Sequence, residues 1–315
     1  MEYRNLGRSG LQVSVVGLGC NNFGRRADLE MTGRVVNQAL DLGINLLDTA
    51  DVYGGNGLSE EFLGKVLQGR RNETVLATKF AMKMGEGPMK SGGSRRYIMA
   101  AVEDSLRRLQ TDHIDLYQMH APDPKTPIDE TLRALDDLVR QGKVRYIGHS
   151  NFAGWQTAAA HFSAEKMGAN PFVAAQNEYN LLNRRIEREL VPACEAYGLS
   201  ILPYFPLASG FLTGKYKQDQ PLPEGARLSS PAAAGMASGI LTPKNYETLG
   251  RLEAFASARG KAMIDLAFGW LASKPFVASV IAGATRPEQV EQNVASGEWR
   301  LLPEELAEVD GITSA

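Results

Sequence analysis

The sequence predicts a (β/α)8 TIM barrel with a short N-terminal β-hairpin before it and a long loop after strand 7. Eight short apolar runs alternate with stretches of helical periodicity along the 315 residues, and eight such units are the number that closes a barrel. A doubly wound open sheet is the competing architecture, and it would usually carry a Gly-x-Gly-x-x-Gly fingerprint after its first strand. The chain there reads Gly17-Leu-Gly19-Cys-Asn-Asn22 and lacks the third glycine. The barrel is therefore favoured, with residues 1–315 forming one domain.

The strands are predicted from short apolar runs, because parallel strands covered by helices are buried on both faces. Residues 2–14 alternate around Gly7 and Gly10, which predicts the hairpin. In chain order, the barrel strands are predicted at residues 15–18, 44–47, 75–78, 114–119, 144–147, 173–175, 199–203 and 277–281.

The helices are predicted from apolar residues spaced by three and four, together with start and stop signals. Gly43 and Gly142 each follow a helix, Ser59 and Ser94 each open one, and Pro127 stands in a first turn. The helices are predicted at residues 29–42, 59–67, 94–109, 127–140, 153–162, 187–197, 246–259, 264–273, 287–295 and 303–309.

Composition argues against several classes of partner. The net charge is −2, so neither nucleic acid nor an anionic membrane is an expected partner. No run approaches the roughly 20 apolar residues of a membrane helix, and the polar N-terminus has no apolar signal-peptide core. Cys20 and Cys194 lie far apart and form no metal-ligand spacing. We expect a cytoplasmic protein without a metal site.

Four ionisable residues lie at or just beyond the carboxyl ends of three predicted strands: Asp48 and Tyr53 in DTADVYG, Lys79 in ATKF and His120 in YQMHAP. These strand ends converge in a barrel. A free phenol has a pKa of about 10, and a neighbouring ammonium such as that of Lys79 would lower it. Asp48 could hold Lys79 protonated, and His120 could donate a hydrogen bond to the reacting oxygen. The set suits carbonyl reduction, with a hydride transferred to carbon and a proton from Tyr53 to oxygen.

These segments resemble those of the aldo-keto reductases, a family of NADP-dependent (α/β)8 oxidoreductases, and the resemblance covers nearly the whole chain. DTADVYG, ATK and QMH match the FDTAxxYG, ATK and strand-end His segments of the family. The resemblance implies that Asp48, Tyr53, Lys79 and His120 form the catalytic tetrad of an NADP(H)-dependent enzyme. That enzyme would reduce aldehydes or ketones to alcohols, or catalyse the reverse.

Three further segments resemble cofactor-binding segments of the family: GKVRYIGHSNF, YFPLASGFLTGKY and GATRPEQVEQN. The resemblance implies that Ser150, Asn151 and Gln176 hold the nicotinamide carboxamide and that Tyr204 stacks on the nicotinamide ring. Lys215 would face the pyrophosphate. The residues expected to contact NADP(H) are Gly19, Cys20, Asn21, Asp48, Ser150, Asn151, Gln176, Tyr204, Phe205, Pro206, Leu207, Ala208, Ser209, Lys215, Arg227, Gly283, Thr285, Arg286, Gln289, Gln292 and Asn293.

The 204–216 segment and the insertion after it resemble the branch of aryl-alcohol dehydrogenases and potassium-channel β subunits. This implies a small-molecule carbonyl substrate, for example an aromatic aldehyde. An apolar pocket wall suits an aryl or alkyl aldehyde. The residues expected to line it are Asn22, Phe23, Val52, Phe80 and Met82.

Two alternative functions and two interpretations of one segment stay open from the sequence. The chain could be an NADPH-binding sensor or regulatory subunit with little turnover, or a barrel of different chemistry such as a phosphate-handling isomerase. Residues 210–245, rich in Gly, Ala, Ser and Pro, could be a surface insertion or a lid that orders over a ligand.

Overall fold

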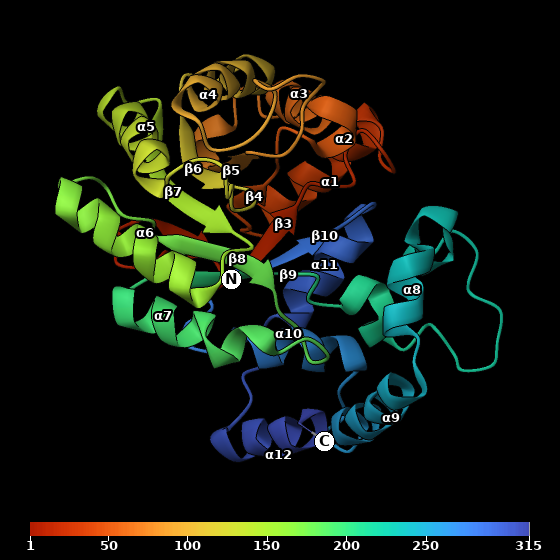
Figure 1. The fold of residues 1–315 in the computed structure, drawn as a ribbon. Helices are drawn as coiled ribbons and strands as arrows, with labels where there is room; N and C mark the ends of the chain where they lie inside the picture. Colours follow the sequence, from red (N-terminus) through yellow and green to blue (C-terminus); the bar gives the residue numbers. More distant parts are fainter. Residues whose placement is uncertain (315) are drawn as a thin grey trace.

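The computed structural model describes residues 1–314 and contains the predicted closed barrel (Figure 1). The strands pair in parallel in the order β10-β3-β4-β5-β6-β7-β8-β9. Val16 of β3 is paired with Val280 of β10, which joins the first strand to the last and excludes the open sheet. The strands are β3 (Val16–Gly19), β4 (Leu46–Asp48), β5 (Val75–Phe80), β6 (Ile114–Met119), β7 (Val144–Ser150), β8 (Ala174–Glu178), β9 (Ser200–Tyr204) and β10 (Val280–Gly283).

Helices surround the barrel, as Figure 1 shows, and several of them bury one apolar face. In α5, for example, Leu132, Leu135 and Leu138 are buried at spacings of three residues. The helices are α1 (Leu29–Asp41), α2 (Tyr53–Asn56), α3 (Leu58–Val66), α4 (Arg95–Leu109), α5 (Ile128–Arg140), α6 (Gly154–Met167), α7 (Leu190–Tyr197), α8 (Ala234–Ile240), α9 (Pro243–Ser257), α10 (Met263–Ala272), α11 (Pro287–Ser296) and α12 (Pro303–Thr313).

The predicted hairpin is formed by the antiparallel strands β1 (Tyr3–Asn5) and β2 (Gln12–Ser14). Its Leu6 and Val13 are fully buried in one cluster with inward-facing barrel residues such as Leu46 and Leu116. The amide of Gly7 donates to Ser200 Oγ at the start of β9. The hairpin therefore closes the amino-terminal end of the barrel.

Several of the predicted helix boundaries were wrong. Helix α6 ends at Met167 rather than at residue 162, α7 begins at Leu190 rather than at residue 187, and α12 ends at Thr313 rather than at residue 309. Ser59 does not cap its helix: α3 is capped by Gly57, whose φ of 107° lies in the left-handed region. The buried Ser59 hydroxyl instead donates to the Cys20 carbonyl. Helix α9 begins at Pro243 rather than at residue 246, because Thr242 caps it by accepting a hydrogen bond from the Asn245 amide.

Residues 210–245 contain more regular structure than a floppy insertion would have. They include helix α8, which follows short 3-10 turns at Arg227–Ser229 and Pro231–Ala233. Leu228 is buried, and its amide donates to the Tyr216 hydroxyl. In Figure 1 α8 and the loop before it lie at the right, on the outside of the barrel. Within residues 1–314, no helix is long and apolar enough to span a membrane.

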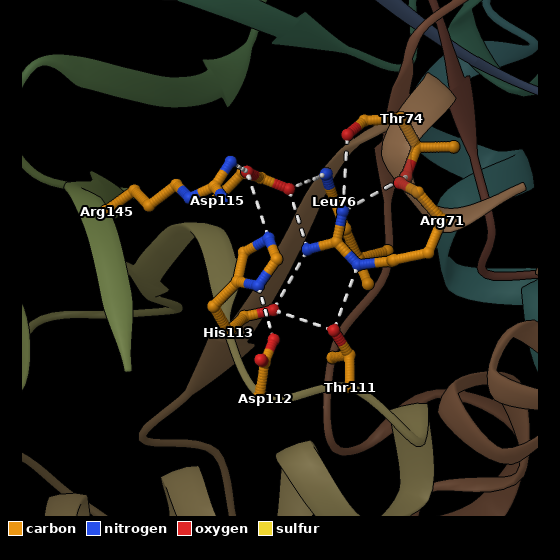
Figure 2. A network of polar contacts seen from close by, with 8 residues as sticks. All are labelled: Arg71, Thr74, Leu76, Thr111, Asp112, His113, Asp115 and Arg145. Atoms are coloured by element: carbon orange, nitrogen blue, oxygen red, sulfur yellow. Dashed lines mark hydrogen bonds and ion pairs between the residues drawn. The ribbon is translucent and has the colours of Figure 1, made fainter. Parts of the chain in front are cut away.

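A network of ion pairs lies at the amino-terminal ends of β5, β6 and β7 (Figure 2). Its centre is Asp115, which is 2% exposed and binds Arg71 at 2.8 Å and Arg145 at 2.9 Å. The Leu76 amide also donates to this carboxylate. Arg71 in turn donates to the His113 carbonyl. The network joins three strands at the end of the barrel where residue changes are expected to affect stability rather than chemistry.

We expect Asp115→Asn to lower the free energy of unfolding by about 3–5 kcal/mol, because it leaves the Arg71 guanidinium without its buried partner. The matched control is Arg145→Gln. Its side chain is 55% exposed, so the loss should be about 1 kcal/mol or less. Urea unfolding of both variants gives the comparison. Equal losses would show that Asp115 is not the centre of the network.

Candidate active site

A cavity of about 700 Å3 opens at the carboxyl end of the barrel. Its walls include the last residues of five strands: Gly19, Asp48, Ser150, Tyr204 and Gly283. Every residue expected to contact NADP(H) lines this cavity except Ala208. The segments that carry them are far apart in the sequence, and closure of the barrel brings them together.

The structure brings the four predicted catalytic residues together at this end. Asp48 ends β4, Tyr53 begins α2, Lys79 lies in β5 and His120 follows β6. The fully buried Lys79 ammonium donates to Asp48 Oδ2 at 2.7 Å and to the Thr49 carbonyl at 2.8 Å. It lies 5.1 Å from the centre of the Tyr53 ring. The phenol thus has a fixed cation beside it.

Asp48 keeps Lys79 charged. Burial by itself disfavours the ammonium, but the pKa of Lys79 is raised on balance, with the charge and the hydrogen bond of Asp48 favouring the ammonium. The second oxygen of Asp48 accepts hydrogen bonds from Gln176 Nε2 at 2.8 Å and Gln118 Nε2 at 3.1 Å. The carboxylate is therefore held in one orientation.

Gln118 was missed by the sequence analysis. It is fully buried in β6, two residues before His120. A signal was present, because an amide inside the apolar run 114–119 needs a hydrogen-bond partner. Gln176 was expected to touch the nicotinamide, and the structure shows that it also supports Asp48.

The pKa of Tyr53 is not lowered, although the sequence analysis expected the Lys79 ammonium to lower it. Burial raises the pKa of this phenol, and the Lys79 ammonium opposes that rise without cancelling it. Tyr53 is consequently protonated at neutral pH. A protonated phenol is the form that can give a proton to a carbonyl oxygen.

His120 is a neutral imidazole in this setting. Burial and the Lys79 ammonium lower the pKa of His120 to about 3. Its ring meets the Tyr53 ring edge to face, with centroids 5.7 Å apart. Asn151 Nδ2 donates to the His120 carbonyl at 2.9 Å, and the Tyr204 hydroxyl donates to Asn151 Oδ1 at 2.8 Å. These contacts fix the loop that carries the imidazole.

One part of the cavity wall is strongly basic and comprises four side chains: Arg26, Lys215, Arg227 and Arg286. Burial, followed by the charges of Arg26 and Arg286, lowers the pKa of Lys215. Burial also lowers the pKa of Arg227, again with Arg26 contributing. Cations that destabilise one another in this way are suited to a multiply charged anion such as a phosphate.

Arg26 was not predicted to line the cavity. Its guanidinium donates to the Gly225 carbonyl at 2.5 Å, so it links the loop after β3 to the long segment 210–245. No sequence signal joins two positions 199 residues apart. Because residues 223–227 line the cavity, the long segment forms part of the site wall.

The sequence model of the aldo/keto reductase family matches residues 15–314. The chain belongs to the aldo/keto reductase family. It is 34% identical over 322 residues to a probable voltage-gated potassium channel subunit beta from Oryza sativa, covering 100% of this chain and 97% of that protein. It is 35% identical to the L-glyceraldehyde 3-phosphate reductase of Escherichia coli K12, covering 98% and 92%. It is 34% identical to the versiconal hemiacetal acetate reductase of Aspergillus parasiticus, covering 97% and 95%.

Membership of the aldo/keto reductase family supports an oxidoreductase that reduces carbonyl groups. The barrel, its N-terminal hairpin and the family predicted from the sequence are confirmed. Among residues 1–314, no group of three or more His, Cys, Asp or Glu side chains is arranged to hold a metal ion.

The structure does not place all of the expected substrate-pocket residues on the cavity wall. Asn22 lines the cavity, whereas Phe23, Val52, Phe80 and Met82 do not. Phe80 is fully buried and packs on Tyr117, with ring centroids 4.8 Å apart. The reason is strand alternation: Lys79 points into the barrel, so Phe80 must point toward the helices. Phe23 is also fully buried, and Met82 is exposed.

Proposed function

We propose that this aldo/keto reductase catalyses the NADPH-dependent reduction of aldehydes and ketones to alcohols, and the reverse reaction. The observation that carries the proposal is one cavity lined by Asp48, Tyr53 and His120 in one part of its wall and by four cations in another. Lys79 is buried behind that wall, against Asp48 and the Tyr53 ring. A proton donor and an anion site in one cavity suit a phosphorylated hydride donor and a carbonyl acceptor.

The residues of the cavity fit NADP(H). Ser150, Asn151 and Gln176 offer hydroxyl and amide groups for a carboxamide, and Tyr204 offers a ring for stacking. Lys215, Arg227 and Arg286 offer positive charge for the pyrophosphate and the 2′-phosphate. When bound, this cofactor supplies the hydride.

The tetrad supplies the proton and the orientation. Tyr53 gives its proton to the carbonyl oxygen as negative charge develops there. Lys79 stabilises the resulting phenolate, and Asp48 keeps Lys79 protonated and aimed. The neutral His120 donates a hydrogen bond to the same oxygen, which fixes the carbonyl beside Tyr53.

Steady-state turnover on a panel of aldehydes tests the proposal. The panel contains aromatic, aliphatic and phosphorylated members, each assayed with NADPH and with NADH. Turnover with NADPH supports the proposal, and absence of turnover across the panel contradicts it. An aromatic aldehyde is the substrate class that we favour within it.

A second candidate is an NADPH-binding regulatory subunit with little turnover. The name of the rice relative favours it. The same panel separates the two candidates, because this one predicts that NADPH binds while every aldehyde is reduced at a negligible rate.

We expect Arg286→Ala to weaken NADPH binding about ten- to a hundredfold and to change NADH binding little. Arg286 lines the cavity just before the start of α11, where a guanidinium and a helix N-terminus both favour a phosphate. Hydrogen bonds to charged groups contribute about 1.5–3 kcal/mol. The measurement is the Kd of both cofactors.

The matched control is Arg25→Ala, because Arg25 is exposed and does not line the cavity. It should leave both Kd values unchanged. Arg26 and Arg227 remain in the Arg286 variant and reduce the effect. Equal weakening of NADPH and NADH would show that Arg286 does not recognise the 2′-phosphate.

A further inference from the structure

A second cluster of buried polar side chains lies on the outer side of β5 and β6, behind the tetrad. Strand alternation places it there: Lys79 points into the barrel mouth, and its neighbour Thr78 points toward helices α3 and α4. Thr78 Oγ1 donates to Glu60 at 2.5 Å. The cluster consists of Asp51, Glu60, Thr78, Tyr97, Arg108 and Tyr117.

The cluster holds two carboxyl groups and one guanidinium. Arg108 is paired with Glu60, with Nε 2.7 Å from Oε2, and Glu60 is fully buried. Asp51 is 1% exposed and forms no ion pair with any residue from 1 to 314. Its Oδ2 accepts one long hydrogen bond, at 3.4 Å, from the Tyr97 hydroxyl. Its Oδ1 has no hydrogen-bond partner in the described chain.

An ionised carboxylate in this position would be an unpaired buried charge, which is costly. Burial, and then repulsion from Glu60, raise the pKa of Asp51 to about 7, although Arg108, the Val52 amide and the Tyr97 hydroxyl act in the opposite direction. The Tyr97 phenol on α4 and the Tyr117 phenol on β6 are the other titratable groups beside it. The neutral acid is the form that fits this environment.

Asp51 is also tied directly to the tetrad. Its amide donates to the Lys79 carbonyl at 3.2 Å, and Lys79 Nζ donates to the Thr49 carbonyl two residues earlier. Tyr53 begins α2 two residues later, and its amide donates to Ala50. The Tyr97 hydroxyl lies 3.4 Å from both Asp51 and the Met82 carbonyl beyond β5. The backbone of Asp51 thus joins Lys79 to the segment that carries Tyr53, and the Asp51 side chain links this segment to Tyr97 of α4.

We propose that Asp51 is a positioning residue that works as a neutral carboxylic acid. With Tyr97 it holds segment 49–53 against Lys79, and its ionisation places a charge opposite Glu60 and displaces Tyr53 from the productive geometry. The kcat of the enzyme therefore falls as the pH rises because Asp51 ionises, and none of the tetrad residues causes this fall. This inference rests on the proposed reductase function.

The first test is kcat against pH for wild type, Asp51→Asn and Tyr97→Phe, with 4-nitrobenzaldehyde and saturating NADPH. Wild-type kcat should fall about tenfold as the pH rises from about 6 to about 8.5. The amide of Asp51→Asn cannot ionise, so its profile should be flat over this range. Tyr97→Phe removes a hydrogen bond that favours the carboxylate, so the fall in its kcat should move to higher pH.

The second test needs no turnover: urea unfolding of wild type and Asp51→Asn at pH values from about 4 to about 8. The folded chain retains the Asp51 proton up to a pH of about 7, whereas the unfolded chain loses it near 3.9. Wild type should therefore lose stability relative to Asp51→Asn as the pH rises between these values. The ratio of their unfolding constants should increase about 10²–10³-fold.

Asp104→Asn is the control for both tests, because Asp104 is a half-exposed aspartate on the same helix as Tyr97. It should reproduce the wild-type curves. A pH-independent stability difference between wild type and Asp51→Asn would overturn the neutral acid. A stability difference between wild type and Asp51→Asn that changes with pH, found together with identical kcat profiles of the two proteins, would overturn the positioning role. If neither protein reduces any aldehyde, the reductase proposal fails and the positioning role with it, while the unfolding data still decide the protonation state.

Discussion

Tyr53→Phe is expected to lower kcat for carbonyl reduction about 10²–10⁴-fold, the range that general acid catalysis contributes. The variant removes one hydroxyl and keeps the ring that lies beside Lys79 and His120. NADPH binding should remain nearly intact, because the cations proposed to hold its phosphates lie on other segments of the chain. The measurements are kcat with an aromatic aldehyde and the Kd of NADPH.

Tyr197→Phe is the matched control, since Tyr197 ends helix α7 and stacks on His161, and neither residue lines the cavity. It should keep wild-type kcat. A Tyr53→Phe protein that retained more than about a tenth of wild-type kcat would remove Tyr53 from the role of proton donor.

Lys79→Met is expected to lose most of its activity and to shift its remaining activity to higher pH. Methionine is also long and unbranched, but it supplies no charge. Without the ammonium, the pKa of Tyr53 rises further, because Lys79 is the group that opposes the effect of burial. Alcohol oxidation needs the phenolate form of Tyr53. The pH at which the oxidation rate rises should therefore be higher in Lys79→Met than in wild type. An unchanged profile would show that Lys79 does not tune Tyr53.

The same substitution leaves the Asp48 carboxylate buried without its cation, which costs about 3–5 kcal/mol of stability. The double variant Lys79→Met with Asp48→Asn separates the two effects. It removes the unpaired charge and should recover most of the lost stability, yet it should not recover activity. Recovery of both would indicate that Lys79 is needed only for folding.

The sequence predicts the strand ends and the tetrad because both follow from local patterns. Short apolar runs mark buried parallel strands, and barrel closure then brings Asp48, Lys79 and His120 together. The same alternation explains the position of Phe80. It was expected on the pocket wall as one of several apolar side chains, yet it follows Lys79 directly, and adjacent strand residues point to opposite faces.

Other features depend on contacts that no local pattern encodes. Arg26 reaches Gly225 only because the long segment folds back over the loop after β3. The protonation of Asp51 depends on Glu60 having taken the guanidinium of Arg108. The net pKa of Tyr53 depends on how completely it is buried, and burial of one side chain is a property of the finished fold.

The interior of the barrel is filled by inward-facing side chains such as Leu46 and Leu116, and Leu6 and Val13 of the N-terminal hairpin cover them at the amino-terminal end. A molecule in the cavity therefore has no passage along the barrel axis and must leave on the side by which it entered. Substrate and product therefore use the same opening of the cavity, and the product must leave before the next substrate enters. Residues 223–227 line that cavity, and Arg26 holds them to the loop after β3 through the Gly225 carbonyl.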